Sequence, residues 1–491
     1  MKLVFNGHNE QYVVEQSLMN LFPGELPVYD AIQPGDNTWA VISISQDADL
    51  CSITTELCVH GKTATEGVTQ TLTGTEYEQE GQRRIALARC FFLAAQAITG
   101  DTPPWGMLTG VRPDKLVTQA LNRGQSAAEA RALMEQQYFV TPSRSGLALE
   151  TGTTAYNAAK DLGPKDIAVY IGIPFCPTRC AYCSFVSHSV ERSFALVPPY
   201  VDALLAEIRA GGRMVKEQGL RVRAFYMGGG TPTTLTAAQM DAVLTAFEES
   251  FDTDPCTEIT VEAGRPDTIT ADKMAVLKAH GVTRISVNPQ TMEDHVLAAI
   301  GRHHTAADIR KAMELVAKYD FPHVNMDLIA GLPADSPEGF RRTLDACMDF
   351  GTDNITIHTL ALKKGSRILT EGLVVPGQEA VAEMLDYAEP LLRKQGYFPY
   401  YLYRQKYMSG SFENIGWCRP GSECWYNVYI MSELCSILSF GAGGSTKMVE
   451  PGTNRIERVF NVKYPKEYTE RPEKCLANQE AFAAFYRDLK L

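Results

Sequence analysis

Apolar and polar positions alternate with two different periods along this chain, and each period holds over long blocks. Residues 39–45 and 51–59 show the two-residue alternation that is typical of strands. From about Arg83 the apolar residues recur every three or four positions, as in a helix. A segment rich in glycine and proline follows at 104–113, and then further polar helical stretches. We therefore expect residues 1–165 to form an accessory α+β domain.

Residues 166–392 alternate short apolar runs with amphipathic helices. The predicted strands occupy residues 167–173, 224–227, 258–261, 284–287, 324–329 and 354–358. The helices between them carry apolar residues at i, i+3, i+4 and i+7, as at Val201, Leu204, Leu205 and Ile208. Six β-α units in succession predict an α/β fold whose parallel sheet curls into a barrel or a partial (β/α)6 barrel. For residues 393–491 we expect a mostly helical C-terminal extension.

Composition narrows the class of protein. The chain has 491 residues and a formal net charge of −12, which argues against nucleic-acid binding because phosphate backbones recruit basic surfaces. There is no apolar run that could span a bilayer and no signal segment at the start, so we expect a soluble, cytoplasmic protein without a membrane partner. Twelve cysteines scattered over such a chain do not form a disulfide framework.

Three cysteines carry the most specific chemical signal. Cys176, Cys180 and Cys183 follow the first core strand with the spacing C-x3-C-x2-C. Zinc needs four ligands and a disulfide needs two cysteines, so neither explains this spacing. Three thiolates on one loop can hold three irons of a [4Fe–4S] cubane and leave the fourth iron open to a small molecule.

Polar groups also follow the later strands. The run Gly229, Gly230 and Thr231 follows the second strand, where missing Cβ atoms allow close approach to a ligand. Glu262 follows the third strand, Gln290 and then Arg302 the fourth, and Asp327 the fifth. Because the chemistry of such folds gathers at the carboxyl ends of the strands, these groups predict a ring around one cavity that suits a nucleoside ligand.

The cysteine loop resembles that of the radical S-adenosylmethionine (SAM) superfamily, whose cluster binds SAM and cleaves it reductively to a 5′-deoxyadenosyl radical. The motifs Tyr-x-Gly-Ile-Pro-Phe-Cys, Gly-Gly-Gly-Thr-Pro-Thr, Val-Asn-Pro-Gln, Gly-Arg-His-His and Met-Asp-Leu-Ile-Ala-Gly-Leu-Pro resemble the oxygen-independent coproporphyrinogen III oxidase family, and the tail resembles its HemZ-like branch. By position in these motifs, the resemblance implies SAM contacts at Tyr170, Tyr182, Gly229, Gly230, Thr231, Glu262, Gln290, Arg302, Asp327 and Ala361.

The resemblance implies oxidative decarboxylation of two propionates of coproporphyrinogen III to vinyl groups, a step of haem biosynthesis. It also implies a flavodoxin or ferredoxin as electron donor. No acid–base side chain is required, because a radical removes the hydrogen atom. Residues 393–491 would then be a coproporphyrinogen-oxidase-like domain. The four carboxylates of the substrate predict one or two cationic partners among Lys363, Lys364, Arg367, Arg404, Lys406 and Lys447.

Two departures from the family pattern leave alternatives open. The oxidases carry a further cysteine two residues after the third ligand, where this chain has Phe185, so a tetrapyrrole methyltransferase or a haem-opening enzyme is a second reading. A haem chaperone is a third, although its His-Asn-x-x-Tyr-Trp stretch here begins with Tyr426.

Four cysteines in the C-terminal region, and at least one of two adjacent histidines, are expected to have structural rather than functional roles. Four further cysteines are spaced too loosely for a cluster and are expected to be free thiols, namely Cys418, Cys424, Cys435 and Cys475. His303 and His304 are adjacent, so at most one of them can face the cavity.

Overall fold

The chain divides into two units, Met1–Leu149 and Glu150–Leu491, each with its own core. The computed structural model describes residues 1–183, 188–254, 256, 258–363, 365–405, 409–453 and 455–489. The expected boundaries at residues 165 and 392 stay predictions. Strands from both sides of residue 392 join one sheet, so the second unit shows no gap there.

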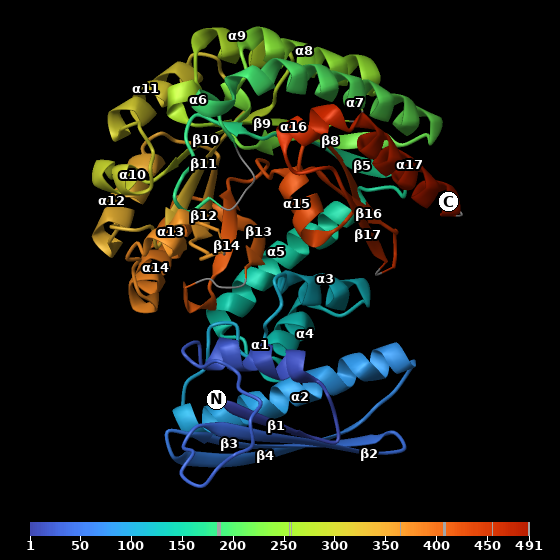
Figure 1. The fold of residues 1–491 in the computed structure, drawn as a ribbon, viewed down its shortest axis with the longest axis vertical. Coiled ribbons are helices and arrows are strands. Elements are labelled where there is room, and N and C mark those ends of the chain that lie inside the picture. Colours follow the sequence, from blue (N-terminus) through green and yellow to red (C-terminus); the bar gives the residue numbers. More distant parts are fainter. Residues whose placement is uncertain are drawn as a thin grey trace. The chain divides into compact units, whose positions relative to one another are not determined.

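The first unit is a four-stranded sheet with helices, as expected for an α+β domain (Figure 1). Its strands run in the order β1-β2-β3-β4, with β1 parallel to β2 and the other pairs antiparallel. The core lies between this sheet and the helices α1 and α2. The elements are β1 Lys2–Asn6, α1 Gln11–Leu21, β2 Trp39–Asp47, β3 Leu50–Val59, β4 Lys62–Thr71, α2 Glu76–Thr99, α3 Asp114–Asn122, α4 Ala127–Ala132, a π-helical turn at Leu133–Gln137, and α5 Pro142–Lys160, which runs on into the second unit.

Helix α2 begins at Glu76, seven residues before Arg83, where the periodicity of apolar residues predicts its start. The Thr75 side chain accepts a hydrogen bond from the Glu78 N–H, and the Glu78 carboxylate accepts one from the Thr75 N–H. This capping box satisfies donors that the first turn of a helix leaves without partners. Polar residues can therefore open the helix, and an apolar pattern alone does not reveal them.

The second unit contains all six predicted core strands in one parallel array. These are β5 Asp166–Ile173, β8 Arg221–Gly229, β9 Glu258–Gly264, β10 Arg284–Gln290, β11 His323–Ala330 and β12 Asn354–Thr359, adjacent in that order. They form the centre of an eleven-stranded sheet. Since the strands are parallel, their carboxyl ends lie along one edge.

Helices connect these strands and cover the outer face of the sheet (Figure 1). Within the described ranges, none of the helices combines the length and the apolar character that crossing a bilayer requires. A short pair of strands, β6 Phe175–Cys176 and β7 His188–Ser189, follows β5. The helices are α6 Val190–Ser193, α7 Val197–Glu217, α8 Ala237–Ser250, α9 Ala271–Ala279, α10 Asp294–Ala299, α11 Ala306–Ala317, α12 Pro337–Met348, α13 Arg367–Glu371 and α14 Gln378–Lys394.

The C-terminal region contains strands as well as helices, so the expectation of a mostly helical extension misses half of it. Strands β13 and β14 extend one edge of the sheet, and β15, β16 and β17 extend the other. These runs are short, and the two strands that join them to the core sheet, β14 and β15, pair with β12 and β5, which are distant in the sequence. The elements are β13 Phe398–Arg404, β14 Glu413–Cys418, α15 Trp425–Ser432, β15 Ser436–Phe440, β16 Ser445–Val449, β17 Ile456–Phe460, α16 Pro465–Glu470 and α17 Pro472–Asp488.

Helix α15 packs against both β8 and β13, which have five strands between them in the sheet order, so the sheet curls around this helix. The first residue of β9, Glu258, accepts hydrogen bonds from the N–H groups of Trp425 (2.9 Å) and Tyr426 (3.2 Å). A carboxylate is favourable at a helix N-terminus. The helix therefore begins at the amino end of the barrel strands, opposite the edge that carries the cysteine loop.

A buried glutamate joins the last elements to α7. Glu207 accepts hydrogen bonds from the Gly441 N–H (2.8 Å), the Asn461 side-chain amide (2.8 Å) and the Tyr468 hydroxyl (2.5 Å). Burial raises the pKa of its carboxyl, and these hydrogen bonds oppose that rise. Since Gly441 directly follows β15, this network fixes the strand that pairs with β5.

We expect Glu207→Ala to destabilise the protein by about 2–4 kcal/mol, because it leaves several buried donors without an acceptor. Urea unfolding followed by circular dichroism measures this loss. Asp202→Ala, an exposed position on the same helix, is the matched control and should stay within about 0.5 kcal/mol of wild type. Equal stability of the two variants would contradict the assigned role of Glu207.

Candidate functional site

The cysteine loop lies at the carboxyl edge of the barrel, directly after β5. Two backbone hydrogen bonds hold its middle: the Ala181 N–H donates to the Ile300 carbonyl (2.9 Å), and the Ile368 N–H donates to the Ala181 carbonyl (3.2 Å). The Thr178 hydroxyl donates to the Gly301 carbonyl (3.0 Å). The segment after α10 and the start of α13 therefore fix the loop from outside.

Buried cations surround the middle cysteine. Burial raises the pKa of the Cys180 thiol, but the guanidinium groups of Arg302 and Arg265 outweigh burial, and the net pKa is lowered. Both arginines are almost fully buried. Arg302 also donates to the Tyr182 hydroxyl (3.1 Å). A thiolate, the form that binds iron, is thus favoured at Cys180.

The role of the three cysteines as ligands of a cubane cluster stays a prediction. Among the described residues, no three His, Cys, Asp or Glu side chains converge closely enough to hold one metal ion. In a cubane each thiolate binds a different iron, so the sulfurs stand farther apart than the ligands of one ion. Cys176 and Cys183 are partly exposed and Cys180 is buried, which leaves one side of the loop open.

The glycine run after β8 joins the cysteine loop through its backbone. The Gly230 N–H donates to the Ile173 carbonyl (2.8 Å), and the Thr231 N–H donates to the Phe175 carbonyl (2.7 Å). A Cβ at Gly230 would lie 2.5 Å from the Phe175 carbonyl oxygen, so only glycine fits. These two N–H groups bind the chain itself, and the close approach that the glycines allow is first of all to the neighbouring strand.

Glu262 and Asp327 place two carboxyl groups inside the barrel. The Tyr226 hydroxyl donates to Glu262 at 2.6 Å. Burial raises the pKa of Glu262 to about 7; the Tyr226 hydrogen bond lowers it, and the charge of Asp327 raises it further. Burial also acts to raise the pKa of Asp327, but His358 outweighs it and the net pKa is lowered. One of the two groups is therefore ionised near neutral pH while the other is poised to gain or lose a proton.

The Asp327 carboxylate belongs to a polar chain across β11, β12 and β13. Its Oδ1 accepts a hydrogen bond from the Asn325 amide (2.8 Å), and its Oδ2 lies 3.9 Å from His358 Nε2. The other ring nitrogen of His358 lies 3.3 Å from the Tyr403 hydroxyl. These contacts fix the orientation of Asp327 at the strand end.

Gln290 ends β10 in a left-handed conformation, with φ +69°. Its side-chain oxygen is buried and has no hydrogen-bond partner among the described residues. A buried acceptor without a partner is costly, and a bound ligand would satisfy it. The Arg302 guanidinium donates to the carbonyl of Asn288, close to Gln290 in the chain, which draws this turn towards the cysteine loop.

Tyr170 lies in a stack of three tyrosine rings that lines the barrel interior. Its ring centroid is 6.2 Å from that of Tyr226 and 6.1 Å from that of Tyr426, and the last two are 4.5 Å apart. Ala361 lies two residues beyond β12, at the same edge of the barrel. The ten positions implied for SAM thus lie in the six core strands or in the segments that follow them, and Glu262 and Asp327 lie within β9 and β11 rather than after them as expected. Their role as SAM contacts stays a prediction.

Three of the four predicted cationic partners that the structure describes are engaged elsewhere. Arg367 forms two hydrogen bonds with Glu371, Arg404 is buried and donates to the Ser411 carbonyl, and Lys447 contacts the Ile430 carbonyl and Glu433. Lys363 is half-buried. Burial lowers its pKa, and the nearby Cys183 acts in the opposite direction. Lys364 and Lys406, like Phe185, lie outside the described residues.

Three residues at this edge escape the sequence analysis: Arg265, Tyr226 and His358. Arg265 and His358 stand at strand ends, as the predicted residues do, and Tyr226 precedes the glycine run by two positions. The position of these residues near strand ends could therefore have identified them from the sequence. Their hydrogen-bond partners could not have been predicted in this way. Arg265, for example, contacts Thr178, which lies 87 residues away in the sequence.

The tail cysteines and the paired histidines agree with the structural expectation. Cys418, Cys424, Cys435 and Cys475 are buried free thiols, and burial raises the pKa of each. His303 is exposed and His304 is buried, so the two do point to different surroundings.

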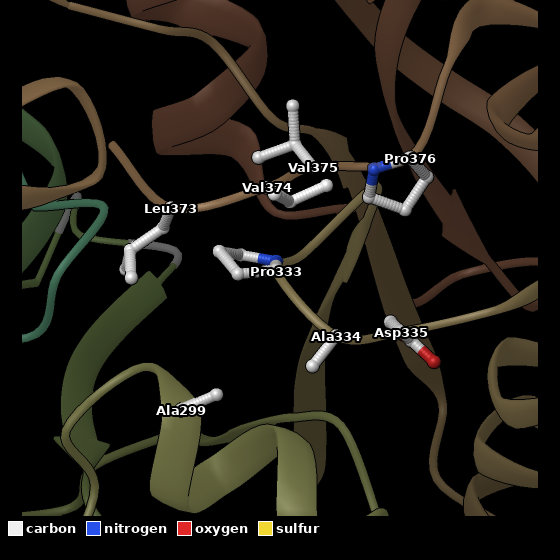
Figure 2. A pocket seen from close by; sticks show the side chains of 8 residues that line it. All are labelled: Ala299, Pro333, Ala334, Asp335, Leu373, Val374, Val375 and Pro376. Atoms are coloured by element: carbon white, nitrogen blue, oxygen red, sulfur yellow. The ribbon is translucent and has the colours of Figure 1, made fainter. Parts of the chain in front are cut away.

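A pocket of about 390 Å³ lies beside this mouth, between the loops after β11 and α13 and the end of α10 (Figure 2). Its lining is apolar apart from Asp335, where burial raises the pKa of the carboxyl to about 6. The lining residues are Ala299, Pro333, Ala334, Asp335, Leu373, Val374, Val375 and Pro376, none of which belongs to the predicted cluster or SAM set.

The chain is similar to one family model and to several known proteins. The model of the radical SAM superfamily matches residues 170–347. The oxygen-independent coproporphyrinogen-III oxidase-like protein HemZ of Bacillus subtilis (strain 168) is 36% identical over 466 residues, covering 93% of this chain and 92% of that protein. The heme chaperone HemW of Mycobacterium tuberculosis (strain ATCC 25618 / H37Rv) is 29% identical over 314 residues, covering 62% and 74%.

Among solved structures, coproporphyrinogen III oxidase (HemN) from Escherichia coli, described as a radical SAM enzyme, aligns with a TM-score of 0.52 at 22% identity. The alignment covers 66% of this chain and 73% of that chain. This likeness concerns the fold, and it confirms the radical SAM α/β architecture expected from the strand pattern.

Replacing Glu262 by glutamine should change how stability depends on pH. Because the pKa is raised from 4.5 to about 7, the folded carboxyl keeps a proton that the unfolded chain releases. The stabilisation by this group is therefore present below about pH 4.5 and is lost as the pH rises through about 7. Glu262→Gln lacks this loss, so its stability relative to wild type should increase between about pH 5 and about pH 8.

Urea unfolding of the ligand-free proteins at a series of pH values measures this difference. Glu249→Gln, at an exposed position near the end of α8, is the control and should give a flat difference. A flat difference for Glu262→Gln as well would contradict a raised pKa.

Proposed function

Because this chain belongs to the HemZ-like family within the radical SAM superfamily, we propose that it is an enzyme of porphyrin biosynthesis that converts two propionate groups of coproporphyrinogen III to vinyl groups without oxygen. A [4Fe–4S] cluster and SAM are the cofactors of its superfamily. The match to HemZ over 93% of the chain is the observation that carries the proposal.

The residues at the barrel mouth suit these cofactors. Cys176, Cys180 and Cys183 would hold three irons, and the Gln290 side-chain oxygen, which has no hydrogen-bond partner in the described part of the chain, is an acceptor that SAM would satisfy. When bound, the cofactors supply radical chemistry able to remove a hydrogen atom from an unactivated propionate carbon. The chain itself binds, orients and excludes water, with α15 closing the interior at the opposite end of the strands.

The substrate needs a partner for its carboxylates, and Lys363 is the described candidate that suits this role best. It stands four residues beyond β12, at the mouth, and close enough to Cys183 for their charges to interact. Arg367, Arg404 and Lys447 are engaged by Glu371, Ser411 and Glu433. We therefore assign one substrate carboxylate to Lys363.

A haem chaperone is the second candidate, since HemW matches 62% of the chain. Against it stands the aligned tail stretch, which forms α15 and presents Tyr426 rather than a histidine to the barrel interior. Axial haem ligation would need a different residue there. A radical SAM enzyme acting on another tetrapyrrole is the third candidate, motivated by Phe185.

One anaerobic experiment separates these candidates. Protein reconstituted with iron and sulfide is incubated with coproporphyrinogen III, SAM and dithionite, and the products are separated by chromatography. Protoporphyrinogen together with 5′-deoxyadenosine supports the proposal. A methylated or linear tetrapyrrole supports the third candidate. Haem binding without SAM turnover supports the second and would refute the proposal.

We expect Cys176→Ala, Cys180→Ala and Cys183→Ala each to lose the iron-dependent visible absorbance of the reconstituted protein, because each removes one of only three protein ligands. Far-ultraviolet circular dichroism should stay unchanged. Cys256→Ala removes a partly buried thiol outside the loop and should keep full absorbance. Full iron occupancy in any of the three variants would refute the ligand assignment.

Lys363→Gln should raise the KM for coproporphyrinogen III about tenfold, since a hydrogen bond to a charged group contributes about 1.5–3 kcal/mol. The KM for SAM should change little. Steady-state kinetics of both variants measure this, with Arg367→Gln as the control, because Arg367 is exposed and already paired with Glu371. An equal KM in Lys363→Gln and wild type would remove Lys363 from the substrate site.

A further inference from the structure

Arg265 is a buried cation that is not among the residues proposed to bind SAM. It directly follows β9, and only 2% of its surface is exposed. Its Nη1 donates to the Thr178 hydroxyl oxygen at 2.7 Å, while Nε and Nη2 bind the two carboxylate oxygens of Asp267 at 3.0 and 3.1 Å. Arginine supplies this fixed fork of donors, which lysine cannot reproduce.

The contact with Thr178 reaches into the cysteine loop itself. Thr178 lies between Cys176 and Cys180 in the chain, and its hydroxyl donates a hydrogen bond to the Gly301 carbonyl oxygen at 3.0 Å. The end of β9, the loop and the segment after α10 are therefore joined through one side chain. A guanidinium at this place both orients the loop and puts positive charge behind it.

The positive charge of Arg265 is only partly neutralised. The Asp267 side chain is 32% exposed, whereas that of Arg265 is 3% exposed, so water screens the carboxylate more than the guanidinium. His304 also approaches this carboxylate, with Nδ1 3.6 Å from the Oδ1 atom of Asp267. Burial lowers the pKa of His304, which disfavours a second positive charge beside Asp267.

Both buried arginines act on the same loop. Arg265 donates to the Thr178 hydroxyl and Arg302 to the Tyr182 hydroxyl, and both of these partners belong to the cysteine loop. A group that gains an electron becomes more negative, and a nearby buried cation stabilises the more negative state. Two buried guanidinium groups held against the loop would thus favour the reduced state of a cluster bound to it.

We propose that Arg265 is a positioning residue that sets the reduction potential of the cluster: through Thr178 it orients the cysteine loop, and its charge makes the cluster easier to reduce by one electron. The proposal rests on the proposed function, since it requires the cluster. One electron enters from an external donor, and no bond is made or broken in this step.

A redox titration of the reconstituted protein tests this, with the potential read from visible absorbance and electron paramagnetic resonance. In Arg265→Gln the equilibrium constant for reduction should fall about tenfold, which is a shift of about 59 mV to more negative potential for a one-electron couple. Arg265→Lys keeps the charge and should recover most of this shift. Asp267→Asn removes the opposing charge and should shift the potential in the positive direction.

Arg367→Gln is the control, because this exposed arginine is paired with Glu371 and should leave the potential unchanged. Shifts of opposite sign in the Arg265 and Asp267 variants support the proposal, since loosening of the loop alone would not reverse sign. If Arg265→Gln fails to keep a cluster, the lysine and Asp267 variants decide. Equal reduction potentials in the cluster-loaded Arg265→Lys, Asp267→Asn and wild-type proteins overturn the proposal. If Arg265→Gln also keeps a cluster, its potential would then equal that of the wild type.

Failure of the proposed function gives a different result. A wild type that takes up no cluster under anaerobic reconstitution refutes the function and this inference together. A wild type that loads a cluster and cleaves SAM, with unshifted potentials in the variants, refutes only the assignment of Arg265.

Discussion

The parallel pairing of β5 with β8 is the constraint on which the rest of the site depends. Their register places Gly172 beside Gly228 and Ile173 beside Gly229, and the Gly230 and Thr231 N–H groups continue the ladder beyond the strand ends. No side chain fits at Gly230, since a Cβ there would overlap the Phe175 carbonyl. The cysteine loop can therefore begin only where this ladder ends, which fixes its position relative to the neighbouring strands.

Further contacts converge on the same loop from three other strand ends. Arg265 reaches it from β9, the Ile300 carbonyl from the segment after β10, and the Ile368 N–H from beyond β12. A loop held from several sides loses little conformational freedom when it binds a ligand, so more of the interaction energy remains for binding. The fold thus prepares the loop before any cofactor is present.

The sequence revealed the parts of this arrangement that depend on local patterns. All six core strands were predictable because each is a short apolar run between helical segments. Strands β15, β16 and β17 were missed because they are five residues long and gain stability from β5 and from each other. The charged residues were least predictable: Arg404 and Lys447 resemble surface cations in the sequence, yet backbone carbonyls and Glu433 hold them inside.

The net charge of the chain does not predict which charges lie next to the cysteine loop. The chain carries −12, from which we expected no nucleic-acid partner, a prediction that stays untested, but two guanidinium groups lie buried against a single loop. Charges on the surface are screened within about 10 Å by ordinary salt, whereas charges in a low-dielectric interior act on their neighbours almost unscreened. Arg265 and Arg302 therefore place positive charge beside the cysteine loop in a chain of negative net charge, and a cluster or an anionic substrate bound there would experience these nearby charges more strongly than distant surface charges.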